Sequence, residues 1–256
     1  MVMVVVVAMV LWAAAGCQDD EHFPPGEGGG AGGGGGSGQI DAGTADAGTA
    51  DAAGGDAGAQ LAGELCDVVD LRRPEFCSDV NLSGIEVRLL DEDVTDQTNA
   101  DGRFSLDVEP EPDLLLQVRS ENETTRLAVV RVDMWDQGGL RVPHVDKDVW
   151  DQLIEGSIGT NEPTGTASIA LYVVSDLDGL PVPDVVVEVA DSGGALVYYD
   201  GGSPDEWIML GDTGALGAAL IVQVPVADSA VVVMVGTVPI DIPVEPDHLT
   251  WARVEV

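Results

Sequence analysis

Alternating apolar and polar positions predict several short strands in the middle of the chain. Ile85, Val87 and Leu89 alternate with charged residues, which is the period of a half-buried strand. Residues 103–108 repeat the pattern after a turn at residues 99–102, so we expect a hairpin there, with Gly102 supplying a positive φ. Residues 114–119 and 126–132 are two further strands, and together these elements predict a small sandwich over residues 65–145.

The same plan is predicted a second time, over residues 166–256. Residues 169–173 alternate, a turn follows at 175–179, and apolar runs recur at 185–189, 231–235 and 249–256. Pro181, Pro183, Pro239 and Pro243 suit edge strands or turns, because proline has no N–H to give to a ladder. The predicted fold class is therefore all-β, with two small Greek-key β-sandwiches of transthyretin-like or immunoglobulin-like type.

A short helix and a linker are predicted between the two sandwiches, over residues 146–165. Trp150, Leu153 and Ile154 have the i, i+3, i+4 spacing of one helical face, and Asp146 is placed to cap it. Gly, Thr, Asn and Pro then dominate residues 156–165, as is typical of a connecting segment.

The N-terminus combines an apolar run with a cysteine. Residues 2–15 are uncharged and are too short to span a bilayer comfortably, but they fit the apolar region of a signal peptide. The string Ala14-Ala15-Gly16-Cys17 resembles a bacterial lipobox. This resemblance implies a signal peptide at 1–16, lipidation (acyl chains such as palmitate) of Cys17, and a membrane anchor made by those chains. The alternative is an ordinary secretory signal with an incidental cysteine. Gln18 after Cys17 resembles the pattern that favours outer-membrane over inner-membrane sorting.

Residues 17–64 are predicted to be a disordered, low-complexity tether. Sixteen of the 33 glycines fall between Gly26 and Gly63, and aspartates recur every five residues from Asp41 to Asp56. Such a segment has almost nothing to bury, and its charges repel one another.

Three cysteines leave an even pair if Cys17 carries lipid. Cys66 and Cys77 are then expected to form a disulfide in an oxidising compartment. A metal site is the alternative, but no other Cys or His lies near them in sequence.

Charge excludes several classes of partner. The 46 acidic against 10 basic residues give a formal charge of −36, which argues against nucleic-acid binding and against electrostatic adsorption to an anionic membrane. Aromatic residues make up only 4% of the chain, so the predicted cores are aliphatic.

One segment resembles a known family. The residues Gly84-Ile85-Glu86-Val87, Thr98 and Asp101-Gly102-Arg103-Phe104-Ser105-Leu106 are similar to the signature of carboxypeptidase regulatory-like domains, over about residues 78–132. The resemblance implies a transthyretin-like, prealbumin-like sandwich. The strand that normally precedes this signature is not predicted here, where the Cys66–Cys77 loop stands instead. The order of a strand, the stretch D-G-x-P-V-P-D-V-x-V at 178–187, and Thr213-x3-Gly217-x-Ala219 before a Val-rich strand ending at Pro225 resembles the same sandwich class more loosely.

Candidate chemistry in the sequence is sparse. Asp212-Thr213-Gly214-Ala215 resembles the aspartic-protease motif, but that mechanism needs two such carboxylates sharing a proton. Neither H-E-x-x-H nor H-x-x-E occurs. Asp91, Asp93, Asp176 and Asp178 are weak calcium candidates; solvated turn acids are the alternative.

The sequence therefore predicts a protein that is not an enzyme and needs no cofactor or metal. We expect a cell-envelope lipoprotein, lipid-anchored at the outer rather than the inner membrane, that presents its sandwiches for binding or structural roles. An adhesin or accessory subunit docking an extracellular protein or glycan is the alternative, and a hydrolase using Asp212 is a third hypothesis.

Overall fold

The structure is a computed structural model, and the ranges that it describes are 60–78, 81–90, 92–109, 111, 113–120, 125–132, 140–190, 193–201 and 206–256. Strands dominate these residues, which confirms the predicted all-β fold class. The expected signal peptide, Cys17 and most of the expected tether lie outside the described residues.

The first half of the described chain contains eight strands and the helical segment. The strands are β1 (Leu61–Val68), β2 (Cys77–Ser78), β3 (Glu86–Leu89), β4 (Thr95–Gln97), β5 (Arg103–Leu106), β6 (Leu115–Arg119), β7 (Ala128–Arg131) and β8 (Leu140–His144). The α-helix α2 (Lys147–Asp151) continues directly into the π-helix η1 (Gln152–Ile158). The Asp146 carboxylate accepts the Asp148 amide at 2.8 Å, so the predicted helix and its cap are confirmed.

The second half supplies eight further strands. They are β9 (Thr166–Val174), β10 (Val187–Val189), β11 (Leu196–Asp200), β12 (Trp207–Ile208), β13 (Ala218–Pro225), β14 (Ala230–Val235), β15 (Val238–Pro243) and β16 (Leu249–Glu255).

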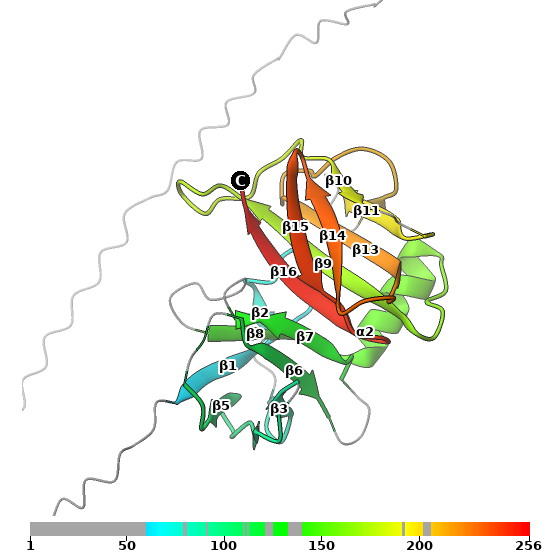
Figure 1. Ribbon diagram of the computed structural model, residues 1–256. Coiled ribbons are helices and arrows are strands. Elements are labelled where there is room, and N and C mark those ends of the chain that lie inside the picture. The colour runs from blue at the N-terminus through cyan, green and yellow to red at the C-terminus, as the bar shows by residue number, and fades with distance from the viewer. Residues whose placement is uncertain are drawn as a thin grey trace, which may run out of the picture. The chain divides into compact units, whose positions relative to one another are not determined.

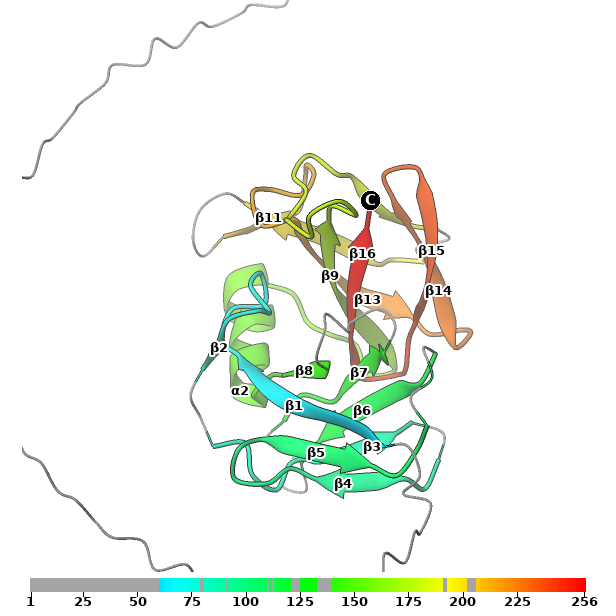
Figure 2. The ribbon, with the colours of Figure 1, turned by 90° about the vertical axis from the view of Figure 1, so that its left-hand side faces the viewer.

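Each half forms a sandwich with the same strand pairing. In the first, β1 pairs antiparallel with β5 and parallel with β8, and it faces the sheet β3-β6-β7. In the second, β9 pairs antiparallel with β13 and parallel with β16, and it faces the sheet β10-β14-β15. The predicted repetition of one plan is therefore confirmed by pairing, although the strands β2, β4, β11 and β12 have no counterpart in the other half (Figures 1 and 2).

A buried threonine fixes the same corner in both sandwiches. In the first, the Ile85 amide donates to Thr98 Oγ1 at 3.0 Å, and that hydroxyl donates to the Leu82 carbonyl. In the second, the Val185 amide donates to Thr213 Oγ1 at 3.0 Å, and that hydroxyl donates to the Val182 carbonyl at 2.9 Å.

A glycine four residues after each threonine completes this corner. Gly102 and Gly217 have φ values of 73° and 63°, a region that side chains with a Cβ rarely adopt. Their carbonyls accept the amides of Leu65 and Val173 respectively, each at 2.8 Å. The motif T-x3-G therefore joins the two sheets of each sandwich.

The two sandwiches share one continuous sheet. Strand β7 of the first pairs in parallel with β16 of the second, with Leu249 opposite Ala128 and Trp251 opposite Val130. This pair joins strands of both sandwiches into one nine-stranded sheet, with the order β12-β11-β13-β9-β16-β7-β6-β3-β4. In Figure 2, β16 runs down to meet β7. Backbone pairing therefore connects the two sandwiches, although residues 146–165 separate them in sequence.

The strand β9 is buried on both faces for that reason. Ile169, Leu171 and Val173 face the core of the second sandwich, whereas Ala170 and Tyr172 join the core of the first. A strand covered on both sides has a continuous apolar sequence rather than a polar face.

Two details of the first sandwich correct the sequence analysis. Strand β1 begins at Leu61, inside the segment expected to be tether and at the place where no strand was predicted. Leu61 and Leu65 are buried there, and a Cβ on Gly63 would lie 2.6 Å from the Phe104 ring, so this glycine permits packing. Composition alone had assigned it to a flexible segment.

The expected hairpin around residues 99–102 is wrong in its pairing. The turn exists, but β4 pairs with β3 whereas β5 pairs with β1 in the other sheet. The Asp96 carboxylate accepts the Ser105 amide at 2.7 Å, so a side chain replaces a ladder bond where the strands diverge.

The edge strand β15 follows the expected pattern. The Val244 amide donates to the Ser229 carbonyl, on the side of β14. Because backbone N–H groups alternate in direction along a strand, the nitrogens at 239, 241 and 243 of the edge strand β15 point away from β14. Two of these three are proline, which confirms their predicted edge role and protects the edge from pairing with another strand.

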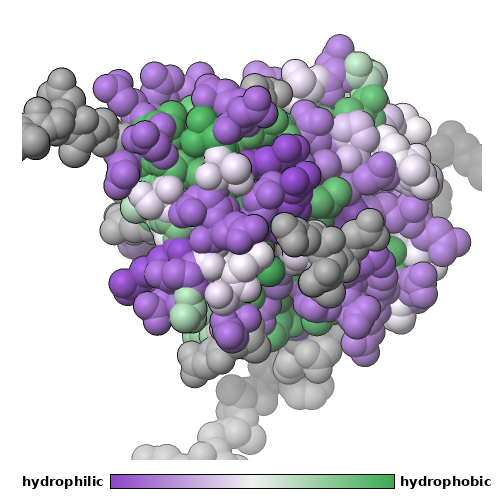
Figure 3. All heavy atoms as spheres, turned by 90° about the horizontal axis from the view of Figure 1, so that it is seen from below, coloured by the Kyte–Doolittle hydropathy of each residue, from purple (hydrophilic) through white to green (hydrophobic). Residues whose placement is uncertain are grey.

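Polar residues cover most of the face shown in Figure 3, on the side where β3 and β5 lie. Among the described residues, no helix has the length and apolar character to cross a membrane.

Candidate functional site

A cavity of about 460 Å³ lies where segments distant in sequence meet. It is bordered by the disulfide loop (residues 66–77), β8, β9 with the turn after it, and β16. Its lining residues are Arg72, Pro74, Glu75, Arg141, Tyr172, Val174, Gly179, Leu180, Pro181, Leu216 and Arg253. The volume lies within the range of small-molecule sites.

The loop closed by the disulfide forms one wall of this cavity. Cys66 on β1 and Cys77 on β2 are bonded, as predicted. Within the loop that they close, the Asp70 carboxylate accepts the Arg72 backbone amide at 3.0 Å and its guanidinium at 2.9 Å. Only 5% of Arg72 is exposed, so the loop carries a buried, oriented positive charge.

Tyr172 fixes the loop to the second sandwich. Its hydroxyl donates to the Leu71 carbonyl, and its ring stacks on Trp251 with the centroids 6.1 Å apart. Burial raises the pKa of Tyr172 well above its ordinary value of 10, so the hydroxyl remains a hydrogen-bond donor at physiological pH. The cavity wall is therefore held by a bond between residues 101 positions apart.

The other two cavity arginines are also held by carboxylates. Arg141 Nε lies 2.6 Å from Glu64 Oε1, and Arg253 Nη1 lies 2.9 Å from Glu255 Oε1. Neither of these glutamates lines the cavity, so the arginines rather than their partners belong to that part of its wall.

A glycine makes room for the guanidinium of Arg253. Gly179 has a φ of 69°, and a Cβ built on it would lie 3.1 Å from Arg253 Nη2. Leu180 follows in the same turn with 61% of its surface exposed while lining the cavity. The rim is therefore apolar beside a cationic wall.

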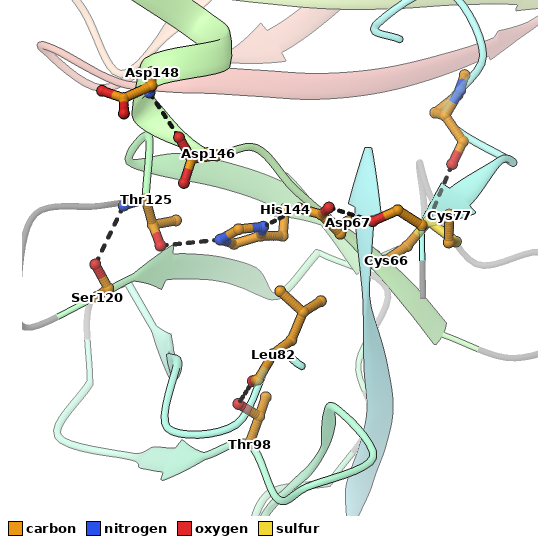
Figure 4. A network of polar contacts seen from close by, with 12 residues as sticks. Cys66, Asp67, Cys77, Leu82, Thr98, Ser120, Thr125, His144, Asp146 and Asp148 are labelled. Atoms are coloured by element: carbon orange, nitrogen blue, oxygen red, sulfur yellow. Dashed lines mark hydrogen bonds and ion pairs between the residues drawn. A yellow bond between two sulfur atoms is a disulfide. The ribbon is translucent and has the colours of Figure 1, made fainter. Parts of the chain in front are cut away.

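A second polar network lies in the first sandwich (Figure 4). Asp67 Oδ1 lies 2.9 Å from His144 Nδ1, and His144 Nε2 lies 3.0 Å from Thr125 Oγ1. Ser78 donates its hydroxyl to Asp67 Oδ2 at 2.5 Å. The hydrogen bond from His144 is the main cause that lowers the pKa of Asp67 below 3.8, against the opposing effect of burial.

This network resembles a nucleophilic triad in the order of its groups. A hydroxyl, an imidazole and a carboxylate follow one another at hydrogen-bond distances. Thr125, however, is only 4% exposed, and a nucleophile must meet its substrate. The network connects β1, β2 and β8 to Thr125, which lies just before β7. We therefore assign it the role of stabilising the sandwich.

The calcium candidates do not form one cluster in the described chain. Asp176 and Asp178 lie in the turn after β9, where the Asp178 carboxylate accepts the Leu180 amide at 3.2 Å. Asp93 is exposed near β4, and Asp91 lies outside the described residues. Within the described ranges, no group of three His, Cys, Asp or Glu side chains is arranged to hold a metal ion.

Asp212 lies on an exposed loop before β13. The next residue, Thr213, is buried and serves the sheet-joining corner, and a Cβ on Gly214 would lie 2.3 Å from the Asp200 carbonyl. The buried Asp200 carboxylate accepts the Gly214 amide at 2.8 Å. Packing around the buried Asp200 carboxylate therefore accounts for the motif at residues 212–215.

No protein-family model and no curated protein matches the chain. Among solved structures, the chain is similar to GBS52, the minor pilin of Streptococcus agalactiae, with 12% identity and a TM-score of 0.24. The match covers 77% of this chain and 94% of the pilin. A likeness of that strength carries no argument about function, and the carboxypeptidase regulatory-like family stays a prediction.

The sequence does not predict the arginine cavity. Arg72, Arg141 and Arg253 stand far apart in a strongly acidic chain, and no motif connects them. One signal was available: the predicted disulfide encloses Arg72 and Arg73, two adjacent basic residues among ten in the chain.

Proposed function

We propose that the chain is a non-catalytic binding protein of the bacterial cell envelope, anchored by lipid on Cys17 at the outer membrane. It presents two carboxypeptidase regulatory-like β-sandwiches on a tether. The observation that carries the binding function is the cavity of about 460 Å³, lined by three arginines and an apolar rim. Concave sites with a few convergent polar groups are the usual form of ligand pockets.

The rigidity of the cavity walls supports binding rather than a purely structural role. The disulfide, the Tyr172–Leu71 bond and the Arg72–Asp70 pair hold the walls before any ligand arrives. A preformed site loses less conformational entropy when it binds.

The binding function is tested with the full chain in lipid nanodiscs. The protein is incubated with fractionated culture medium, and retained small molecules are identified by mass spectrometry. Leu216→Trp fills the cavity from a lining position, whereas Val186→Trp adds the same bulk at an exposed position outside it. We expect Leu216→Trp alone to lose the retained compounds. Retention of nothing by the wild type, or equal retention by both variants, contradicts the proposal.

The anchor has a separate test. Mass spectrometry of the mature N-terminus is expected to show Cys17 with a diacylglyceryl thioether and an acylated amine, and Cys17→Ser is expected to remain unprocessed. Cleavage elsewhere, with an unmodified cysteine, contradicts lipidation.

An adhesin or accessory subunit is the alternative function. Leu177 and Leu180 are exposed in the turn beside the cavity, as Phe76 is in the disulfide loop. If an extracellular protein or glycan is the partner, Leu177→Ser weakens its binding while Leu216→Trp leaves it unchanged.

A further inference from the structure

We propose that the cavity binds a small organic anion: a carboxylate or phosphate group meets the arginines, and an apolar body lies against Tyr172 and Leu216. This inference rests on the proposed binding function and specifies the class of ligand. It comes from the charge, the burial and the apolar lining of the same cavity.

Charge is the first argument. The chain has only ten basic residues and a formal charge of −36, yet three of those ten line one cavity. Glu75 is the single acidic residue among the lining side chains. A cationic wall in so acidic a protein selects the negatively charged end of a ligand, because like charges elsewhere repel it.

The geometry of the arginines is the second argument. A guanidinium carries five N–H donors in a planar fork that matches carboxylate and phosphate oxygens. Asp70 accepts hydrogen bonds from both Nε and Nη2 of Arg72, whereas Glu64 and Glu255 each contact one nitrogen of Arg141 and Arg253. None of these carboxylates is a lining residue, and each holds its guanidinium in a fixed orientation. Arg72 is buried and the Arg253 side chain is 17% exposed, so their attraction for an anion is less screened by water than at an open surface.

The apolar lining decides against an inorganic anion as the intended ligand. Six lining residues have apolar side chains or rings, namely Pro74, Tyr172, Val174, Leu180, Pro181 and Leu216. A bare phosphate would leave this surface in contact with water, whereas an aryl or alkyl group would cover it. The cavity therefore fits an amphipathic molecule with one charged end.

The test uses matched soluble probes on the full chain in nanodiscs. N-acetylphenylalanine carries a carboxylate, its amide is the neutral isostere, phenyl phosphate is the phosphate analogue, and inorganic phosphate has no apolar body. Binding is measured by ligand-observed NMR titration, with empty nanodiscs as background. The double variant Arg141→Gln/Arg253→Gln leaves the buried Arg72 in place. Arg103→Gln is the control, because Arg103 also contacts Glu64 but does not line the cavity.

We expect saturable binding of N-acetylphenylalanine or phenyl phosphate, and the stronger of the two identifies the anionic group. The neutral amide and the double variant should each weaken binding roughly tenfold or more, as expected for loss of charged hydrogen bonds. Arg103→Gln should bind as the wild type does, and circular dichroism checks that every variant is folded.

Binding of the neutral amide as tight as that of the stronger anion, or no difference between the double variant and Arg103→Gln, overturns the anion assignment. If neither anion binds but Leu216→Trp still abolishes retention of a medium compound, the anion inference fails while the binding function stands. If nothing is retained in either experiment, both fail.

Discussion

Asp67 shows how one side chain joins three strands of the first sandwich. Its two carboxylate oxygens contact His144 on β8 and Ser78 on β2, and its own backbone belongs to β1. Both contacts favour the ionised carboxylate, and the pKa of Asp67 is lowered in consequence. A lowered pKa in the folded state means that ionised Asp67 stabilises the fold.

The pH dependence of unfolding tests this role. The stabilisation from Asp67 is present above the ordinary aspartate pKa of 3.8 and is lost as the pH falls through the lower folded-state pKa. Because Asn resembles a protonated Asp, Asp67→Asn should lower the free energy of unfolding by about 1–2 kcal/mol at neutral pH. The gap from wild type should close in acid.

Urea unfolding at neutral pH and at about pH 2.5 measures that gap. Asp93→Asn, at an exposed position, is the control and should leave stability unchanged at both values. A gap of the same size at both pH values would contradict the assignment.

At the scale of elements, the corner motif T-x3-G accounts for the likeness of the two sandwiches. Thr98 and Thr213 make the same bonds to an amide and a carbonyl, and Gly102 and Gly217 make the same turn. Both residues of each corner, a threonine and a glycine four positions later, can be found in the sequence. The motif was therefore visible before the structure, although its role in joining two sheets was not.

Replacing each threonine tests whether the two corners are equivalent. Thr98→Val and Thr213→Val remove a hydroxyl that bonds a buried amide and carbonyl, so each should cost about 1–3 kcal/mol in the free energy of unfolding. Thr98→Ser and Thr213→Ser retain the hydroxyl and should recover most of that loss. Chemical denaturation measures all four variants, and a neutral Thr213→Val would show that only the first corner depends on it.

Strands with a clear period were predictable, and those lacking one were not. β5 places Phe104 and Leu106 inside and polar residues outside, so its alternation is read directly. β1 was missed because Ala62 and Gly63 resemble the tether, and β8 because it is short and contains Arg141 and Pro143. A proline is tolerated there since β8 lies in parallel pairing with β1 alone among the described strands.

At the scale of the whole molecule, the fusion of the sandwiches and the cavity have a common cause. The β7–β16 pair joins segments about 120 residues apart, and this contact brings Arg141 of the first sandwich towards Arg253 of the second. No local pattern encodes such a pairing, because either strand would read the same beside another neighbour. The cavity could not be predicted for the same reason.

Glu162 is the polar centre of this junction. It accepts Arg126 Nη2 at 2.8 Å, Trp150 Nε1 at 3.1 Å and Ser168 Oγ at 2.5 Å, so it connects the first sandwich, α2 and β9. Burial lowers the pKa of Arg126, and the charge of Glu162 opposes that shift. The segment expected to be a linker therefore carries a partly buried ion pair.

Glu162→Ala should destabilise both sandwiches together. Loss of the carboxylate leaves the Arg126 charge in a desolvated site, at a cost of about 3 kcal/mol. Glu155→Ala, exposed on η1, is the control and should change stability by no more than about 0.5 kcal/mol. Hydrogen–deuterium exchange measures amide protection in β6 of the first sandwich and in β13 of the second. In Glu162→Ala, we expect this protection to fall in both strands in the same denaturant range. Loss of protection in β6 alone would show that the shared sheet does not couple the two sandwiches.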